Sequence, residues 1–127
     1  MKAALDATPL TLAKGGIRRY VLELSRALAE QFPEDDFTLL SDQPYPAPEE
    51  APPNLRTGRL PRSSFERRWW ACGVQRVMAE TGAELFHGTH FTLPWLPLQP
   101  GVMTLHDLSP WRDPRWQAGA TFVRRRA

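Results

Sequence analysis

The sequence predicts an α/β fold in which a mostly parallel sheet is covered by helices. Short apolar runs closed by polar, Gly or Pro residues alternate along the chain with two longer segments whose apolar residues recur at helical spacing. Strands that alternate with helices form parallel sheets, because each helix carries the chain back across the sheet. With 127 residues and 42% apolar composition, the chain is long enough for one domain with a real core.

The first part of the chain predicts a strand, a helix and a second strand. Residues 2–7 form a short apolar run that polar and Pro residues close, so they predict a buried first strand. Residues 17–32 predict an amphipathic helix, which Pro33 ends. Residues 36–41 predict the second strand. The apolar residues that define the helix are Ile17, Val21, Leu24, Leu28 and Phe32.

A proline-rich segment, residues 43–54, follows and holds five of the thirteen prolines. It predicts an extended surface loop that is an insertion within the domain rather than a boundary between two domains. Residues 54–61 then predict a third strand, which Gly58 interrupts.

Ser63 with Glu66 three residues later fits a capping box, so a second helix is expected to begin there and to run to Gly82. The single cysteine, Cys72, has no partner for an internal disulfide, and its aromatic neighbours indicate a packing role rather than an exposed nucleophile. The predicted apolar face of this helix consists of Phe65, Trp69, Trp70, Cys72, Val74, Val77 and Met78.

Two more apolar runs, residues 83–88 and 101–107, predict the last strands, and the proline-rich residues 89–100 separate them. The carboxyl ends of parallel strands meet at one edge of a sheet, where ligands of such folds bind. The residues expected at this edge are Gly15 and Gly16 after the first strand, His87, Gly88, Thr89 and His90 after the fourth, and His106 and Asp107 after the fifth.

The adjacent glycines Gly15 and Gly16 precede the first predicted helix. Without Cβ atoms they let backbone N–H groups and the positive helix end face an anion such as a diphosphate. The same pair is equally compatible with a plain turn. The dinucleotide fingerprint G-x-G-x-x-G is not met, because no third glycine follows, and Asp42 is more typical of a polar turn than of a ribose ligand.

The three histidines allow either a metal site or a polar pocket. His87, His90 and His106 supply imidazoles, but neither an H-E-x-x-H motif nor a Cys pair accompanies them, so no metal is expected. A polar pocket fits better, in which His106 faces a substrate hydroxyl beside the carboxylate of Asp107. A purely structural His–Asp pair remains the alternative.

The start of the sequence indicates a cytoplasmic protein, because the first residues hold too few apolar positions for a signal peptide or a membrane span. The net charge of +2 says little about partners. Arginines nevertheless cluster, and such clusters can meet phosphates or anionic lipid, so a peripheral place at the inner face of the membrane is the alternative. The clusters are Arg18 and Arg19, Arg67 and Arg68, and Arg124, Arg125 and Arg126, of which the last is expected on a solvent-facing helix rather than in a nucleic-acid tail.

Three motifs occur in order along the chain: LDATPLTLAKGGIRRYVLELSRAL, ELFHGTHFTLP and VMTLHDLSPWRDPRW. Together, at these intervals, they closely resemble the N-terminal domain of family 4 (group 1) glycosyltransferases of the GT-B fold. The resemblance implies that residues 1–127 form one of two Rossmann-like domains. Such enzymes transfer a sugar, with retention of configuration, from a nucleotide-sugar to an acceptor hydroxyl in the cleft between the domains, and no cofactor is implied.

The family pattern also implies roles for the residues at the predicted edge. Gly15 and Gly16 would approach the donor diphosphate from across the cleft. His106 would hydrogen-bond the transferred sugar and Asp107 would shape that pocket, so these two are the expected catalytic residues. The chain departs from many relatives at Arg18, where they have glycine, and at His90, where they have asparagine. The expected acceptor-binding residues are Arg19, His87, Gly88, Thr89 and His90.

In the family a donor-binding domain follows, and this sequence stops before it, at TFVRRRA. We therefore expect the acceptor-side half of a transferase, inactive alone. Its expected partners are a weakly bound nucleotide-sugar donor, a sugar or lipid-linked acceptor, and the missing donor-binding domain. The alternative is a free-standing Rossmann-like module that binds a phosphorylated ligand without catalysis.

Aromatic residues and arginines, which are enriched at protein interfaces, concentrate near the end of the sequence at Trp111, Trp116, Phe122 and Arg124 to Arg126. We expect the chain to self-associate through this C-terminal segment. The loop residues Phe91, Trp95 and Leu96 are expected to be exposed as well, and a nucleic-acid partner is not expected.

Overall fold

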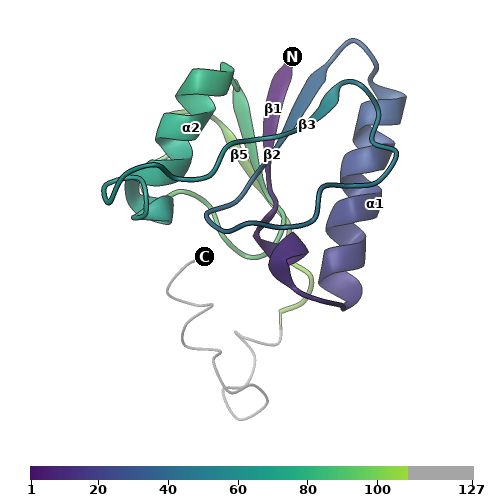
Figure 1. The fold of residues 1–127 in the computed structure, drawn as a ribbon, viewed down its shortest axis with the longest axis horizontal. Helices are drawn as coiled ribbons and strands as arrows, with labels where there is room; N and C mark the ends of the chain where they lie inside the picture. Colours follow the sequence, from purple (N-terminus) through teal and green to yellow (C-terminus); the bar gives the residue numbers. More distant parts are fainter. Residues whose placement is uncertain (109–127) are drawn as a thin grey trace.

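A parallel sheet forms the centre of the protein in the computed structural model, which describes residues 1–108 (Figure 1). The strands lie in the order β3-β2-β1-β4-β5, and every neighbouring pair is parallel. This arrangement confirms the predicted α/β fold, which is Rossmann-like. The strands are β1 (Lys2–Asp6), β2 (Asp36–Leu40), β3 (Leu55–Thr57), β4 (Leu85–Gly88) and β5 (Gly101–Met103).

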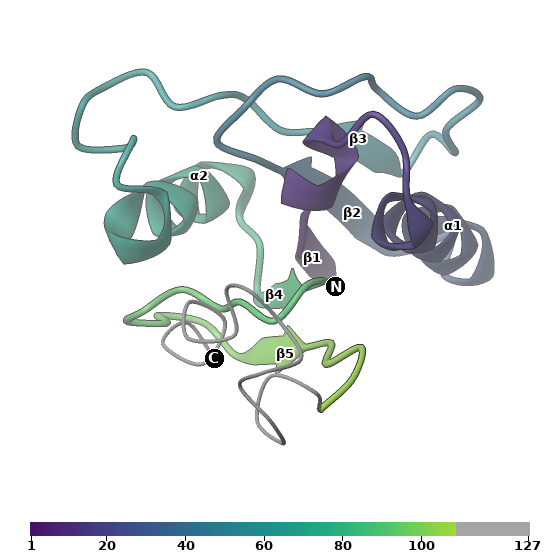
Figure 2. The ribbon, with the colours of Figure 1, turned by 90° about the horizontal axis from the view of Figure 1, so that it is seen from below.

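Helices cover both faces of the sheet (Figure 2). Helix α1 (Gly16–Gln31) lies on one face and helix α2 (Val74–Thr81) on the other, and two short helical turns, η1 (Thr8–Thr11) and η2 (Trp69–Gly73), precede them. Successive side chains of a strand point to opposite faces. Leu5 of β1 therefore packs in the core beside α1, while its neighbour Ala4 packs in the core beside α2.

The side of α1 that faces the sheet is lined by small residues. Val21, Ser25 and Ala29 are buried and recur every four residues along one face of the helix. Small side chains let the helix lie close to the sheet. Phe32 was predicted on this buried face, but it is 53% exposed, because it lies just beyond the last helical residue, at the C-cap.

The second helix begins later than its predicted start at Ser63. The Ser63 hydroxyl does accept the N–H of Glu66 (3.2 Å), but the Glu66 carboxylate accepts the N–H of Arg62 (2.7 Å), whereas a capping box would direct it to the N–H of Ser63. Residues 63–68 form turns. The carbonyl group of Arg68 then accepts three successive N–H groups of η2, and α2 follows.

Two further differences concern exposure and strand length. Phe65, predicted on the buried face of the second helix, is 58% exposed because it lies in the turn before η2. The strands β3 and β5 end earlier than predicted. The N–H of Gly58 bonds to the carbonyl oxygen of Leu39 (2.8 Å) and that of Thr104 to the carbonyl oxygen of Gly88 (2.8 Å), so the chain stays against the sheet after each strand ends.

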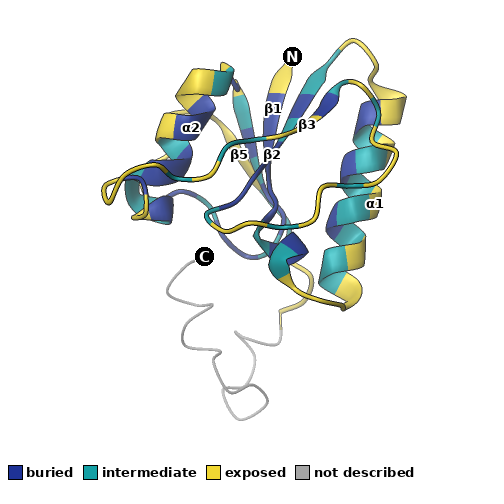
Figure 3. Ribbon diagram, in the orientation of Figure 1, coloured by how far each residue is buried: buried dark blue, intermediate teal, exposed yellow. Residues whose placement is uncertain are grey.

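Buried positions follow the strands and the inner sides of both helices (Figure 3). Within residues 1–108, no helix is both long and apolar enough to cross a membrane. The predicted self-association rests on Trp111, Trp116 and Phe122, which lie outside the described residues together with Arg124 to Arg126.

Candidate functional site

Figure 2 looks onto the edge of the sheet where the strands end. Helix α1 starts at this edge, β4 ends there, and the loop after β5 returns to it. The ring of Tyr20, in the second turn of α1, packs edge-on against the ring of His106, with 4.9 Å between their centroids. The start of α1, His87 and His106 therefore share one edge, as the alternation of strands and helices predicts.

Gly15 and Gly16 have different structural needs. Gly15 caps α1 with a φ of +134°, which residues with a side chain rarely adopt, so the turn explains this glycine. Gly16 is already helical, and a Cβ there would meet nothing within 4 Å. Within residues 1–108, no side chain caps the first N–H groups of α1. Gly15 thus makes the turn, while Gly16 leaves the helix N-terminus open on its outer side.

Hydrogen bonds join β4, the loop after β5 and α1 through one hydroxyl group. The Oγ1 of Thr104 lies 2.8 Å from the Nε2 of His87 and 3.0 Å from the hydroxyl of Tyr20. Burial lowers the pKa of His87, which favours the neutral imidazole. A neutral Nε2 can accept, so Thr104 can donate to His87 while it accepts from Tyr20.

His106 is anchored on one side and exposed overall. Its Nε2 lies 2.9 Å from the carbonyl oxygen of Thr89, so this nitrogen carries a proton and donates. Thr89 is fully buried, and its hydroxyl donates to the carbonyl oxygen of Asp6 (2.8 Å). The loop after β4 therefore ties His106 to the end of β1. Asp107, the next residue, is exposed as well.

Two more rings complete what we call the histidine cluster: Tyr20, His87, His90, Phe91, Thr104 and His106. The ring centroids of His90 and Phe91 lie 5.6 and 5.7 Å from that of His106. Phe91 was expected to be exposed but is only 6% exposed, and its ring packs edge-on against the rings of His90 and His106.

His90 carries an unused polar atom. Its Nδ1 is buried and has no hydrogen-bond partner within the described residues. Burial, and secondly the nearby His106, lower the pKa of His90 and favour its neutral form. An unpaired buried polar atom costs free energy until a water molecule or a ligand hydroxyl bonds to it. A polar ligand would satisfy this nitrogen only after a shift that exposes it.

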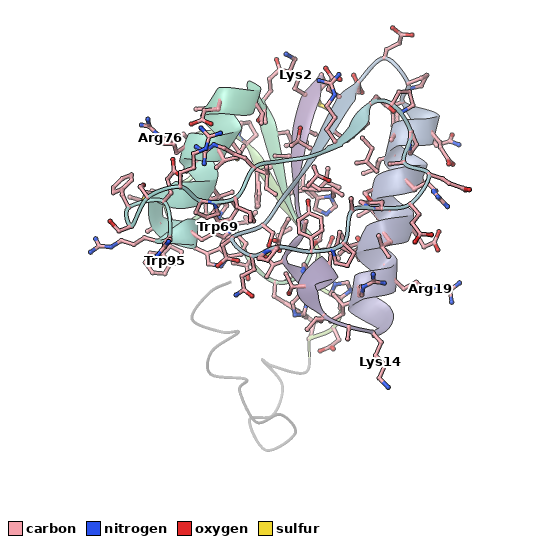
Figure 4. All side chains as sticks on the ribbon, in the orientation of Figure 1. Lys2, Lys14, Arg19, Trp69, Arg76 and Trp95 are labelled. Carbon is pink, nitrogen blue, oxygen red and sulfur yellow. The ribbon has the colours of Figure 1, made fainter. Side chains whose placement is uncertain are left out.

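Three predicted acceptor-binding residues are not members of the histidine cluster. A Cβ at Gly88 would overlap the carbonyl oxygen of Thr92, so close backbone packing requires this glycine. The side chain of Arg19 points away from the body of the protein, with its Nε 4.0 Å from Glu23 (Figure 4). Its neighbour Tyr20 takes part instead. Thr89 contributes its backbone carbonyl, since its hydroxyl is already bound.

Asp6 was missed by the sequence analysis, although it ends a buried strand at the ligand edge. It is 2% exposed, and its Oδ1 accepts the N–H of Thr8 (2.9 Å). Burial raises the pKa of Asp6 to about 6, against the opposing effect of the hydrogen bonds from Thr8. Since Leu5 pairs with His87 and side chains alternate, Asp6 lies on the opposite face of the sheet from His87.

The chemistry of this edge suits a ligand with many hydroxyl groups and one anionic part. Imidazoles, a phenol and a threonine hydroxyl can each donate or accept a hydrogen bond, and the open start of α1 can face an anion. Among residues 1–108, no three His, Cys, Asp or Glu side chains converge as a metal site would require.

Comparisons of the chain with protein-family models, with curated proteins and with solved structures find no match. The resemblance to glycosyltransferases therefore rests on the three sequence motifs, and any function rests on those motifs and on the geometry of this edge.

Proposed function

We propose that this chain is the acceptor-side domain of a retaining glycosyltransferase of the GT-B fold, which transfers a sugar from a nucleotide-sugar to an acceptor hydroxyl. The observation that supports it most is the contact of His106 with the second turn of α1, close to the helix end whose N–H groups no side chain caps within residues 1–108. Tyr20 makes this contact, since it belongs to α1 and packs on His106. A group that binds sugar hydroxyls thus adjoins a group that attracts phosphate.

The start of α1 would face the donor diphosphate. Among the described residues, no side chain caps its first N–H groups, and the helix dipole adds positive potential there. Gly16 leaves the approach to these N–H groups free of a Cβ. Neutralising the diphosphate as it leaves would favour the transition state, because charge builds up on the leaving group in sugar transfer.

The histidine cluster would bind the sugars. With its Nε2 donating to Thr89, a neutral His106 has Nδ1 as an acceptor for a sugar hydroxyl. The unpaired Nδ1 of His90 would take a second polar group. Within this proposal Asp107 shapes the same pocket. His87 is a positioning residue, since its Nε2 bonds to Thr104 and thereby holds Tyr20 in place.

The proposal includes a separate donor-binding domain as partner. Without the donor-binding domain, this chain supplies only one side of the cleft and should bind a nucleotide-sugar weakly, with a Kd of about 1 mM or above. The chain by itself should show no sugar transfer. Transfer by this chain alone would contradict the need for a second domain.

An NMR titration with UDP-glucose and GDP-mannose tests the proposal. We expect saturable shifts of the amide signals at the start of α1 and of the ring signals of His106 at roughly 1–10 mM ligand. Gly16→Ala should weaken binding at least about threefold, because its Cβ would stand in front of the N–H groups. Gln31→Ala, at the other end of α1, is the matched control. Absence of shifts with either ligand, or equal binding by both variants, would contradict the proposal.

The same NMR measurement with inorganic phosphate as the ligand separates the proposal from the alternative, a free-standing module for phosphorylated ligands. Such a module needs no second wall, so a simple phosphorylated ligand should bind at micromolar Kd at the start of α1, without any shift at His106.

A further inference from the structure

We propose that a second pocket, on the α2 side of the same edge, binds a saccharide that carries an anionic group. The pocket brings two adjacent arginines, Arg67 and Arg68, together with three indole rings, those of Trp69, Trp70 and Trp95. The inference requires only binding by this chain, so it does not rest on sugar transfer.

The pocket is open and has a volume of about 670 Å³. Pockets for small molecules commonly measure about 300–1,000 Å³, so it has room for a monosaccharide with a substituent. Its walls come from the start of η1, the turn after β2, η2 and the loop after β4. The N–H of Trp95 donates to the carbonyl oxygen of Trp70 (2.9 Å), which fixes the loop against η2.

The arginines supply positive charge that the protein itself leaves unused. Arg67 and Arg68 are exposed, and neither side chain makes an ion pair or a hydrogen bond within the described residues. Arg59, by contrast, is bound to two carboxylates of its own chain. Guanidinium groups bind phosphate and carboxylate through paired, charge-assisted hydrogen bonds. A free pair of arginines in a pocket is therefore suited to an anion.

The tryptophans supply apolar planes next to this charge. The side chain of Trp95 is 62% exposed, an unusual cost for an indole in water, and Figure 4 shows it at the outer edge with Trp69 farther inside. The apolar C–H face of a sugar ring can cover such a plane. Trp69 is 3% exposed, and its Nε1–H is buried without an acceptor within the described residues.

Polar side chains on the same walls favour a saccharide over a purely aromatic anion. Asp42 accepts hydrogen bonds, while Gln43 and Thr8 both donate and accept, and all three line the pocket. Such groups match ring hydroxyls. This pocket is distinct from the histidine cluster, because its residues Trp69 and Trp70 pack with Ala4 on the α2 side of the sheet, whereas His87 shares the opposite face with Leu5.

NMR of the tryptophan Nε1–H signals, assigned through Trp→Phe variants, tests this inference with four probes: glucose 6-phosphate, glucuronate, glucose and inorganic phosphate. We expect saturable shifts of the signals of Trp69, Trp70 and Trp95 with at least one of the two charged sugars. The two charged sugars distinguish a phosphate from a carboxylate as the anion. Glucose and inorganic phosphate should each bind at least about fivefold more weakly, since each offers half of the contacts.

Variants test whether the two arginines and the exposed indole of Trp95 bind the charged sugar. The double change Arg67→Gln and Arg68→Gln, and separately Trp95→Ala, should each weaken the binding at least about fivefold. Arg18→Gln with Arg26→Gln, two arginines of α1 that do not line this pocket, is the matched control and should leave the binding unchanged. No shift with either charged sugar, equal binding of glucose, or equal losses in both arginine pairs would overturn the proposal.

Discussion

Asp6 lies at the end of β1, where burial raises its pKa to about 6. A group whose pKa is raised on folding binds more protons in the folded chain than in the unfolded one. Its contribution to stability is therefore present below the unfolded pKa of about 3.9 and is lost as the pH rises through about 6. At pH 7 the ionised carboxylate costs the folded state on the order of 2–3 kcal/mol.

Asp6→Asn should remove this cost, because the amide Oδ1 can still accept the N–H of Thr8. We expect the variant to be more stable than the wild type by about 1–3 kcal/mol at pH 8 and nearly equal to it at about pH 3.5. Urea unfolding at both pH values measures the difference. An equal gain in the free energy of unfolding at both pH values would show that ionisation of Asp6 is not the cause.

The two glycines at the start of α1 should respond in opposite ways to alanine. Gly15→Ala should lower the free energy of unfolding by about 1–2 kcal/mol, because a side chain is strained at a φ of +134°. Gly16→Ala should leave it unchanged or raise it by up to about 1 kcal/mol, because its Cβ meets open space and alanine favours helix. Thermal unfolding of both variants checks this. A loss of stability in Gly16→Ala would mean that the fold itself needs the second glycine.

The turn before η2 and the end of α2 are joined by ion pairs of Arg59. Arg59 lies 2.9 Å from Oε1 of Glu66 and 2.6 Å from Oε1 of Glu80, and it holds the pKa of Glu66 down at about 2. The Glu66 carboxylate is thereby drawn to Arg59 and to the N–H of Arg62. As a result, only one of the two hydrogen bonds of the capping box predicted at Ser63 forms, the one from the N–H of Glu66 to the Ser63 hydroxyl.

Gly73→Ala tests the packing of η2 against this turn. Gly73 has helical backbone angles, so helix propensity alone favours alanine by about 1 kcal/mol. A Cβ there would overlap the carbonyl oxygen of Glu66, however. We therefore expect a loss of about 2 kcal/mol or more in urea unfolding. Ala79→Gly, at an exposed position of α2, is the control and should lose only about 1 kcal/mol. A stabilised Gly73→Ala variant would contradict the close contact.

In the described part of the molecule, the sheet is covered by α1 on one face and α2 on the other, and its edge strands, β3 and β5, have three residues each. Short edge strands offer little backbone for pairing with another chain. Association of whole molecules is therefore expected through side chains rather than through the sheet. The aromatic residues and arginines between Trp111 and Arg126 are the sequence's candidate for this.

Light scattering at micromolar concentration tests the predicted self-association. We expect a mass above that of one chain, and a monomer after deletion of residues 113–127, because the deletion removes Trp116, Phe122 and the last three arginines. The same deletion should leave unfolding of the parallel sheet cooperative. A monomeric mass before and after deletion would contradict the prediction.

The sequence by itself determined the order of the elements, the parallel sheet and the edge that gathers Gly15, His87 and His106. The elements follow from local apolar periodicity, and the shared edge follows from the rule that the carboxyl ends of parallel strands meet at one edge of a sheet. Neither inference requires knowledge of a particular contact. Strand and helix ends were predicted less accurately, because capping groups such as Glu66 also bond to partners outside their own turn, here Arg59. The catalytic and acceptor-binding roles of the edge residues stay predictions from the resemblance.

Only the tertiary structure decided which side chains meet. Tyr20 and Thr104 are 84 residues apart in sequence, yet their hydroxyls bond, and this contact brings α1 to the histidine cluster. The pocket of Arg67, Arg68 and Trp95 likewise forms from separate loops. No local pattern specifies such pairs, because they depend on how loops of different length close over one edge of the sheet. The burial that raises the pKa of Asp6 has the same origin, since packing from both neighbouring strands and from η1 removes water from a residue that looks ordinary in the sequence.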